Sequence, residues 1–151
     1  YEGTLVLGQR EGQGKFVWSN GQTYEGEWRN DAPNGQGTMK FANGNLYEGS
    51  VVAGIPNGNG KMAYANGDSY SGEMVKGIPS GRGTFLWKGG DRYSGQWKSG
   101  QKEGNGVFTW RNGDRWEGVY RDDQQTDAGT LIRHNEQQTS VAGSTSSALA
   151  R

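Results

Sequence analysis

An aromatic residue followed by Glu or Ser and then Gly recurs along this chain at a constant spacing of 23 residues. The six triplets are Tyr1-Glu2-Gly3, Tyr24-Glu25-Gly26, Tyr47-Glu48-Gly49, Tyr70-Ser71-Gly72, Tyr93-Ser94-Gly95 and Trp116-Glu117-Gly118. A strict period of this length is typical of repeat proteins, whose units bury their apolar faces by stacking on their neighbours. We therefore expect the function to lie on an extended surface rather than in one deep pocket.

One repeat reads as a pair of strands. Residues 24–28 alternate between large or small and acidic side chains, which is the period-2 pattern of a strand, and residues 35–41 alternate again. We expect a loop over residues 29–34 and a tight turn at Asn43-Gly44, in which both central residues adopt positive φ.

The same alternation predicts which residues face inward in every repeat. The inward positions of the first strands are Leu5, Trp28, Val51, Met74, Trp97 and Tyr120. Those of the second strands are Phe16, Met39, Met62, Phe85, Phe108 and Leu131, followed by the row Trp18, Phe41, Tyr64, Trp87, Trp110 and Arg133. Glycine, with 28 positions, is expected at bends and where a ring lies flat on the backbone.

These patterns predict an all-β fold, a single-layered, elongated and twisted antiparallel sheet of six 23-residue β-hairpin repeats over residues 1–138. The repeats begin at residues 1, 24, 47, 70, 93 and 116, and the last is degenerate because Asp127-Ala128-Gly129 replaces its Gly-x-Gly. Residues 139–151 lose the period, so we expect a flexible or partner-ordered tail without a strand, although residues 147–151 have room for one helical turn. Since the chain begins with Tyr1 rather than Met, we expect it to be part of a longer protein.

The 23-residue unit resembles the MORN (membrane occupation and recognition nexus) repeat. The resemblance rests on Tyr-Glu-Gly-x-Trp, Gly-x-Gly-x-aromatic-x-aromatic and Asn-Gly-Asp/Gln-x-Tyr, and it covers residues 1–138. It implies a single layer of β-hairpins with a groove lined by the repeat aromatics. It further implies a role in protein interaction or dimerisation, with phosphoinositide binding as a contested alternative, and it brings no catalytic residue.

Composition argues against several other classes of function. The chain has no Cys, one His and a formal net charge of zero, so we predict no catalytic residue, no metal site and no cofactor. The basic residues form no stripe, which argues against nucleic acid as a partner. The sequence leaves the compartment open, and we favour the cytoplasm over the periplasm.

Two motifs have a structural and a functional interpretation. Gly-x-Gly-Lys at residues 12–15 and 58–61 would cradle a phosphate only if a helix followed, and because a strand is predicted we interpret these glycines as turn or bend residues. Asp68, Asp91 and Asp114 recur one repeat apart, about 10 Å in a sheet, which is too far to share one Ca²⁺. We expect them to accept hydrogen bonds from turn amides instead.

We predict a non-catalytic interaction module that binds a protein or peptide segment in an aromatic groove or pairs with a second copy as a homodimer. The alternative is a peripheral membrane module that binds anionic lipid of the phosphoinositide type. The candidate groove residues are Trp18, Tyr24, Trp28, Phe41, Tyr47, Tyr64, Tyr70, Trp87, Tyr93, Trp97 and Trp110. We expect the first ring of each repeat to be mainly structural, and Trp18, Trp87 and Trp110 to be more open.

Overall fold

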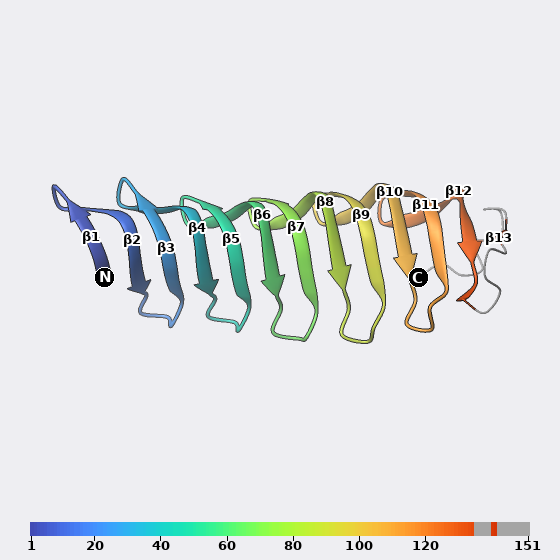
Figure 1. Ribbon diagram of the computed structural model, residues 1–151, viewed down its shortest axis with the longest axis horizontal. Helices are drawn as coiled ribbons and strands as arrows, with labels where there is room; N and C mark the ends of the chain where they lie inside the picture. The colour runs from blue at the N-terminus through green and yellow to red at the C-terminus, as the bar shows by residue number, and fades with distance from the viewer. Residues whose placement is uncertain (135–139, 142–151) are drawn as a thin grey trace. The chain divides into compact units, whose positions relative to one another are not determined.

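The computed structural model describes residues 1–134 and 140–141, and these residues form an all-β protein (Figure 1). The strands are β1 (Glu2–Val6), β2 (Gln9–Val17), β3 (Thr23–Arg29), β4 (Ala32–Lys40), β5 (Leu46–Val52), β6 (Ile55–Ala63), β7 (Ser69–Val75), β8 (Ile78–Leu86), β9 (Arg92–Lys98), β10 (Gln101–Thr109), β11 (Arg115–Arg121), β12 (Gln124–Ile132) and β13 (Ser140–Val141). The predicted all-β architecture of antiparallel hairpins is confirmed.

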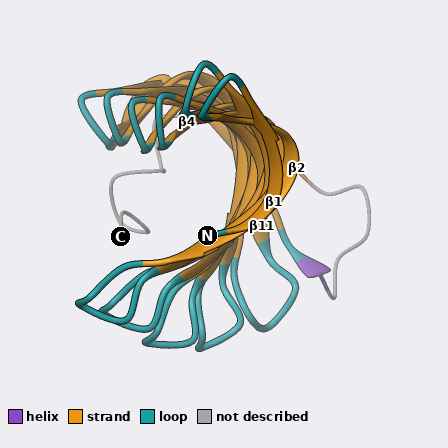
Figure 2. Ribbon diagram, turned by 90° about the vertical axis from the view of Figure 1, so that its left-hand side faces the viewer, coloured by secondary structure: helices purple, strands orange, loops and turns teal. Residues whose placement is uncertain are grey.

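The chain divides into two compact units, Tyr1–Ile78 and Pro79–Arg151. In the first unit each strand from β1 to β7 pairs antiparallel with the next one in the sequence. In the second unit the same holds from β8 to β13. The strands bend strongly along their length, so that each hairpin forms an arc (Figure 2).

Side chains alternate between two faces along every strand. The inner face, which we define by Tyr24, Gly26 and Trp28 of β3, carries the buried residues, while Glu25 and Arg29 on the outer face are exposed or partly exposed. The buried apolar side chains are Tyr24, Trp28, Met39, Tyr47, Val51, Met62, Tyr70, Met74, Tyr93, Trp97, Phe108, Trp116, Tyr120 and Leu131. In the first two predicted inward rows most positions are therefore core, with Leu5 exposed and Phe16 and Phe85 half-buried. The third row is not core, because its five aromatic residues are half-buried and Arg133 is exposed.

The first ring of each repeat covers a pair of glycines. Gly26 of β3 lies opposite Gly37 of β4, and a Cβ on either residue would overlap backbone atoms or the Tyr24 ring. The ring thus lies flat on two strands of its own hairpin, and the Tyr24 hydroxyl donates a 2.7 Å hydrogen bond to the Glu27 carbonyl. The arrangement recurs in both units, with Tyr47 donating to Ser50 and Tyr93 donating to Gln96.

The tight two-residue turns lie at the opposite end of the hairpin from the one predicted. Asn30 and Asp31 both have positive φ, 52° and 69°, and they join Arg29 directly to Ala32. This is the conformation of a type I′ turn, whose twist matches that of the flanking strands. The expected loop over residues 29–34 is therefore wrong, because β4 already begins at Ala32. The pair Ala53-Gly54 forms the same turn in the next repeat.

The Asn-Gly dipeptide forms a different turn from the one predicted. Gly44 has φ 97°, whereas Asn43 is not among the residues of positive φ. The Gly44 amide donates to the Phe41 carbonyl and the Phe41 amide donates to Asn45. This is a three-residue loop that ends in a left-handed glycine. Asn43 stabilises it by accepting a 3.0 Å bond from the Asn45 amide through its side chain.

A bulge accounts for the early start of the second strand. Gly26 pairs with Gly37 and Trp28 with Pro33, so that Glu27 alone faces three residues of β4. Gly35, at φ 108°, makes this irregularity possible. The Glu27 carboxylate accepts a hydrogen bond from the Gln36 amide and so satisfies the displaced backbone. The turn or bend predicted at the Gly-x-Gly pairs is confirmed, and it lies at the first glycine of each pair, here Gly35.

The sixth repeat keeps the hairpin but changes its ring. Trp116 replaces the tyrosine and is fully buried over Gly118 and Gly129. Its indole N–H has no hydrogen-bond partner among the residues described. The carbonyl that the tyrosine hydroxyl would reach, that of Val119, instead accepts a 2.7 Å bond from the Thr126 hydroxyl. The degenerate repeat is thus stabilised by a different polar contact.

The expectation of no strand after residue 138 is wrong at one point. Ser140–Val141 forms β13, which pairs with Leu131 and Ile132 of β12. Residues that end a sheet expose unpaired backbone groups, and this short pairing covers part of the β12 edge. The helical turn considered for residues 147–151 lies outside the described residues.

A methyl group beneath a buried ring should destabilise the fold. We expect Gly37→Ala to lower the free energy of unfolding by about 1–3 kcal/mol, because the new Cβ and the Tyr24 ring need the same space. Gly89→Ala is the matched control, since a Cβ there meets open space, and it should change stability by less than about 0.5 kcal/mol. Urea unfolding of both variants measures the difference. Equal stabilities would contradict this packing.

Candidate partner-binding trough

The structure divides the predicted groove residues into two groups. Six are buried in the inner face, namely Tyr24, Trp28, Tyr47, Tyr70, Tyr93 and Trp97. Five are only half-buried, namely Trp18, Phe41, Tyr64, Trp87 and Trp110. We call the inner-face surface formed by these rings in each unit the trough of that unit, with Trp18, Phe41 and Tyr64 in the first unit and Trp87 and Trp110 in the second. These five rings keep part of their surface open, whereas the other six are packed within the hairpins.

In the first unit the trough contains a pocket of about 320 Å³. Phe41, Met62 and Tyr64 line it together with Ile55 and Pro56. Asn43 and Asn45 contribute from the Asn-Gly loop, and Gly54 and Gly77 from the type I′ turns. Because both ends of the strands contribute to one pocket, the curvature of the hairpins (Figure 2) is what encloses it. The pocket has no charged side chain.

In the second unit the trough is a row of aromatic contacts. The ring centroids of Phe85 and Trp87 lie 4.7 Å apart, those of Trp87 and Phe108 5.5 Å, and those of Phe108 and Trp110 5.1 Å. Phe108 is buried, whereas Trp87 and Trp110 keep part of their surface open. Ring pairs of this kind contribute about 0.5–1.5 kcal/mol each, so contacts with Phe85 and Phe108 favour one placement of the two tryptophans.

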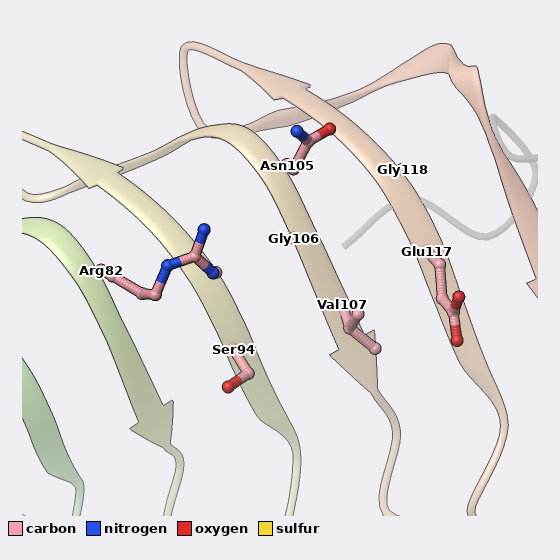
Figure 3. A pocket seen from close by; sticks show the side chains of 8 residues that line it. Arg82, Ser94, Asn105, Gly106, Val107, Glu117 and Gly118 are labelled. Carbon is pink, nitrogen blue, oxygen red and sulfur yellow. The ribbon is translucent and has the colours of Figure 1, made fainter.

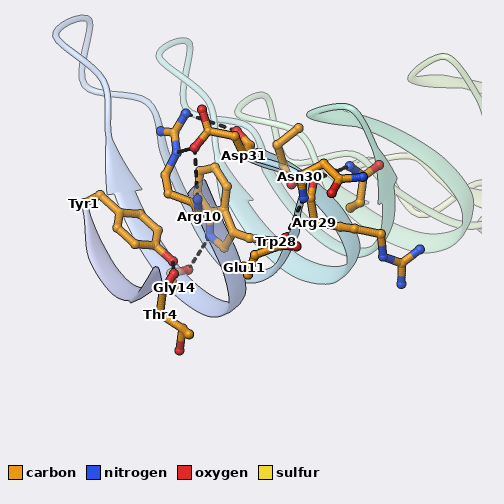
Figure 4. Close-up of polar contacts among 11 residues, drawn as sticks. Tyr1, Thr4, Arg10, Glu11, Gly14, Trp28, Arg29, Asn30 and Asp31 are labelled. Carbon is orange, nitrogen blue, oxygen red and sulfur yellow. Dashed lines mark hydrogen bonds and ion pairs between the residues drawn. The ribbon is translucent and has the colours of Figure 1, made fainter. Parts of the chain in front are cut away.

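A cation lies beneath the rings in two repeats. The Arg10 guanidinium lies 4.7 Å from the Trp28 ring centroid (Figure 4). Its distance from the Phe16 ring centroid is 5.0 Å. The guanidinium also forms a 2.7 Å ion pair with Asp31, and this contact holds the pKa of the Asp31 carboxyl below its usual range. Each cation–π contact contributes about 0.5–2 kcal/mol, depending on how far it is removed from water.

Lys102 occupies the equivalent position in the second unit. Its ammonium lies 5.6–5.8 Å from the ring centroids of Trp87, Tyr93 and Tyr120. The side chain is only 12% exposed and forms a 2.7 Å ion pair with Asp123. This caged cation is part of the fold, and the sequence analysis did not identify it.

The residue at the repeat position of Arg10 and Lys102 determines which residue occurs in the type I′ turn of the next hairpin. Arg10 and Lys102 donate their amide N–H groups to the side chains of Asp31 and Asp123 in the following type I′ turns, at 3.0 and 3.1 Å. Pro33 occupies the same position one repeat after Arg10, and Gly54 then replaces the aspartate. Because proline has no N–H to satisfy, the turn after it needs no acceptor. The backbone at this position is therefore satisfied in two ways, either by a cation whose N–H group bonds to Asp or by a proline followed by Gly.

The predicted role of the repeating aspartates is confirmed where the contacts are resolved. The Asp91 carboxylate accepts a 2.9 Å hydrogen bond from the backbone amide of Arg111. The Asp114 carboxylate accepts one of the same length from the backbone amide of His134. Asn45 does the same for Ala65 in the first unit. Each side chain therefore caps a loop of the next repeat and links neighbouring hairpins.

A second hollow, of about 380 Å³, lies on the outer face of the second unit (Figure 3). Arg82, Ser94, Asn105 and Glu117 give it a polar lining, and Val107 contributes an apolar side chain. Ser94 and Glu117 both flank Val107 across the ladder. The hollow lacks an aromatic ring, so it offers a weaker anchor than the trough.

The described residues also bear on metal sites and membrane-spanning helices. Residues 1–134 and 140–141 bring no three His, Cys, Asp or Glu side chains together in a way that would hold a metal ion. Within the same residues, no helix has the length and apolar character needed to cross a membrane.

Each unit is a sheet of repeated β-hairpins, which places the molecule among the hairpin-repeat proteins. A sequence model of the MORN repeat matches residues 1–23, 24–46, 47–69, 70–92 and 93–115. The chain therefore belongs to the MORN repeat family, a non-enzymatic repeat module associated with protein or membrane interactions. The sixth hairpin lies beyond the matched repeats. A comparison with curated proteins finds no match.

The pairing of a cation with Asp, or of a proline with Gly, predicts an energetic coupling between Lys102 and Asp123. We expect Lys102→Pro and Asp123→Gly to interact by about 1–3 kcal/mol in a double-mutant cycle. Either single change removes only one partner of a bonded pair, whereas the double change installs the Pro and Gly combination of other repeats. Chemical unfolding of the four proteins measures the coupling. Additive single effects would refute the coupling.

Burial of the tyrosines predicts a loss of stability in alkali. Burial raises the pKa of Tyr24 and Tyr120 from 10.0 to about 12. The unfolded chain therefore loses these protons at lower pH than the folded one, so stability is retained below pH 10 and falls between about pH 10 and 12. Phenolate absorbance and circular dichroism, recorded together, should show buried tyrosines that ionise only as the protein unfolds. Ionisation of every tyrosine near pH 10 in the folded protein would contradict this.

Proposed function

We propose that this protein is a non-catalytic interaction module that binds a peptide segment of a protein partner in the trough. The observation that carries the proposal is the half-buried state of Trp18, Phe41, Tyr64, Trp87 and Trp110, beside first rings that are buried. Rigid, partly open aromatic side chains are common anchors of protein interfaces. Their grouping on one face of each unit gives a surface rather than isolated rings.

The first rings and the trough rings have different structural roles, and this difference supports the proposal. Tyr24 and its equivalents hold the hairpins together, and their hydroxyl groups are used within their own repeat. The trough rings come directly after the end of the second strand of each repeat, where the loop to the next hairpin begins, and they are less buried there than the first rings. A repeat protein that needed these side chains only for stability would gain more by burying them fully.

Self-association and binding to anionic lipid are the other outcomes to be tested. Exposed cations of the outer face alternate with acids, as in the pair of Arg115 and Glu117 at 2.6 Å, and such mixed charge attracts an anionic surface weakly. The uncharged pocket of the first unit fits an apolar segment of a protein better than a phosphate group.

The test is affinity capture with the wild-type chain and the double variant Trp87→Ala/Trp110→Ala. Leu86→Ala is the matched control, because Leu86 is an exposed apolar residue of the same strand region. We expect a protein that the wild type and the control retain and the double variant loses, and whose contact segment binds directly as a synthetic peptide. Equal recovery by all three proteins would contradict the proposal.

Two further measurements separate the alternatives. Co-sedimentation with phosphatidylcholine vesicles, with and without phosphatidylserine and phosphoinositide, tests for a lipid surface. Salt-resistant binding to the anionic vesicles alone would favour the membrane function over the peptide function. Analytical ultracentrifugation of the wild type and the double variant tests whether a second copy occupies the trough.

A further inference from the structure

The pocket of the first unit restricts the kind of peptide that fits it, and this inference rests on the function proposed above. Hairpins repeat along the sheet at twice the strand spacing, about 9.6 Å. Phe41 and Tyr64 are equivalent rings of neighbouring repeats, so their binding positions recur at this interval. A bound chain that contacts both must present equivalent side chains about 9.6 Å apart.

Only one regular backbone matches this interval closely. A polyproline II helix has three residues per turn and rises about 3.1 Å per residue, so every third side chain returns to the same face after about 9.3 Å. An extended strand presents one face every about 6.7 Å. An α-helix returns after seven residues and about 10.5 Å, an error that grows with each repeat. The spacing therefore favours polyproline II.

The polar groups of the pocket also favour a polyproline II backbone. Asn45 and Asn43 use their side-chain oxygens to accept the amides of Ala65 and of Asn45 itself. Their side-chain NH₂ groups remain as donors beside Phe41 and Tyr64. A polyproline II segment has no internal hydrogen bonds and offers free carbonyls, whereas the carbonyls of an α-helix are already used.

The pocket of the first unit has no charged side chain in its lining, and this indicates which peptide compositions fit it. Phe41, Tyr64, Ile55, Pro56 and Met62 form an apolar site, and its other side chains are neutral amides. An acidic side chain entering it would lose water without gaining a cationic partner among the lining residues. Pro56 is buried and lines the same pocket as Phe41. Neutral, proline-containing sequence complements the site.

We propose that the trough of residues 1–78 binds an uncharged polyproline II segment that carries an apolar residue at every third position. Successive apolar residues contact Phe41 and Tyr64, and the carbonyls between them accept hydrogen bonds from Asn43 and Asn45. The segment enters an existing pocket, so the hairpins do not need to open.

Fluorescence anisotropy of the full chain with three labelled, uncharged peptides tests the proposal. The first contains four copies of Leu-Gln-Pro, which places Leu at every third position. The second contains three copies of Leu-Gln-Pro-Gln, which has the same length but rotates each Leu to a new face. The third is a helix of Ala and Gln with Leu at every seventh position.

We expect the first peptide to bind at least about tenfold more tightly than the second. Phe41→Ala should weaken it by about fivefold or more, while Leu46→Ala on the outer face should have no effect. Asn45→Asp keeps the oxygen that caps Ala65 and removes the NH₂ donor, and the fold accepts it because Asp91 and Asp114 occupy equivalent positions. This variant should also weaken the first peptide, and it serves as the test if Phe41→Ala does not fold.

Equal binding of the first two peptides, or binding of the first that neither Phe41→Ala nor Asn45→Asp changes, would overturn the proposal. Tighter binding of the helical peptide, lost with Phe41→Ala, would overturn it and leave the peptide-binding function in place. Failure of all three peptides would overturn it as well. The capture experiment with Trp87→Ala/Trp110→Ala in the second unit then decides the proposed function separately.

Discussion

The fold depends on one contact, an aromatic ring that lies flat on two glycines of adjacent strands. Tyr24 covers Gly26 and Gly37 in this way, and its hydroxyl returns to the backbone of the same hairpin. A single sheet has no second layer to bury its inner face. The ring therefore replaces that layer, burying the backbone beneath it and its own surface together. Glycine is required on both strands because any side chain there would occupy the space of the ring.

Neighbouring hairpins are linked by side chains that satisfy the backbone of the next repeat. At the Asn-Gly end, Asp91 and Asp114 cap the following loop. At the type I′ end, the turn amide of Gly54 donates to Pro33, and Ala53 donates to the side chain of Asn34. Each repeat thus depends on its neighbour for hydrogen bonds as well as for packing, as expected for a repeat array. The trough rings take part in the packing through contacts such as that between Phe108 and Trp110, and they remain half-buried.

The period and the alternation of side chains predicted the hairpins and most of the core from the sequence, because burial on one face of a strand requires period 2. The turn types were not predicted. The Asn43-Gly44 pair indicated a two-residue turn, but the tight turn lies at Asn30-Asp31, where the bulge at Gly35 shifts the strand start. The caged Lys102 was missed because its contacts come from residues far apart in the sequence, namely Trp87, Tyr93 and Tyr120. A comparison of position 10 across repeats, where Arg or Lys pairs with Asp and Pro with Gly, carried the signal.

The central claim is that the trough rings are accessible while the inner-face rings beside them are not. Acrylamide quenching of tryptophan fluorescence in the native chain tests it directly, because the six tryptophans fall into two groups. Trp18, Trp87 and Trp110 are half-buried, whereas Trp28, Trp97 and Trp116 are buried. The account predicts two populations, one quenched readily and one protected, with the first removed progressively by Phe substitution of Trp18, Trp87 and Trp110. A single, uniformly protected population would contradict it.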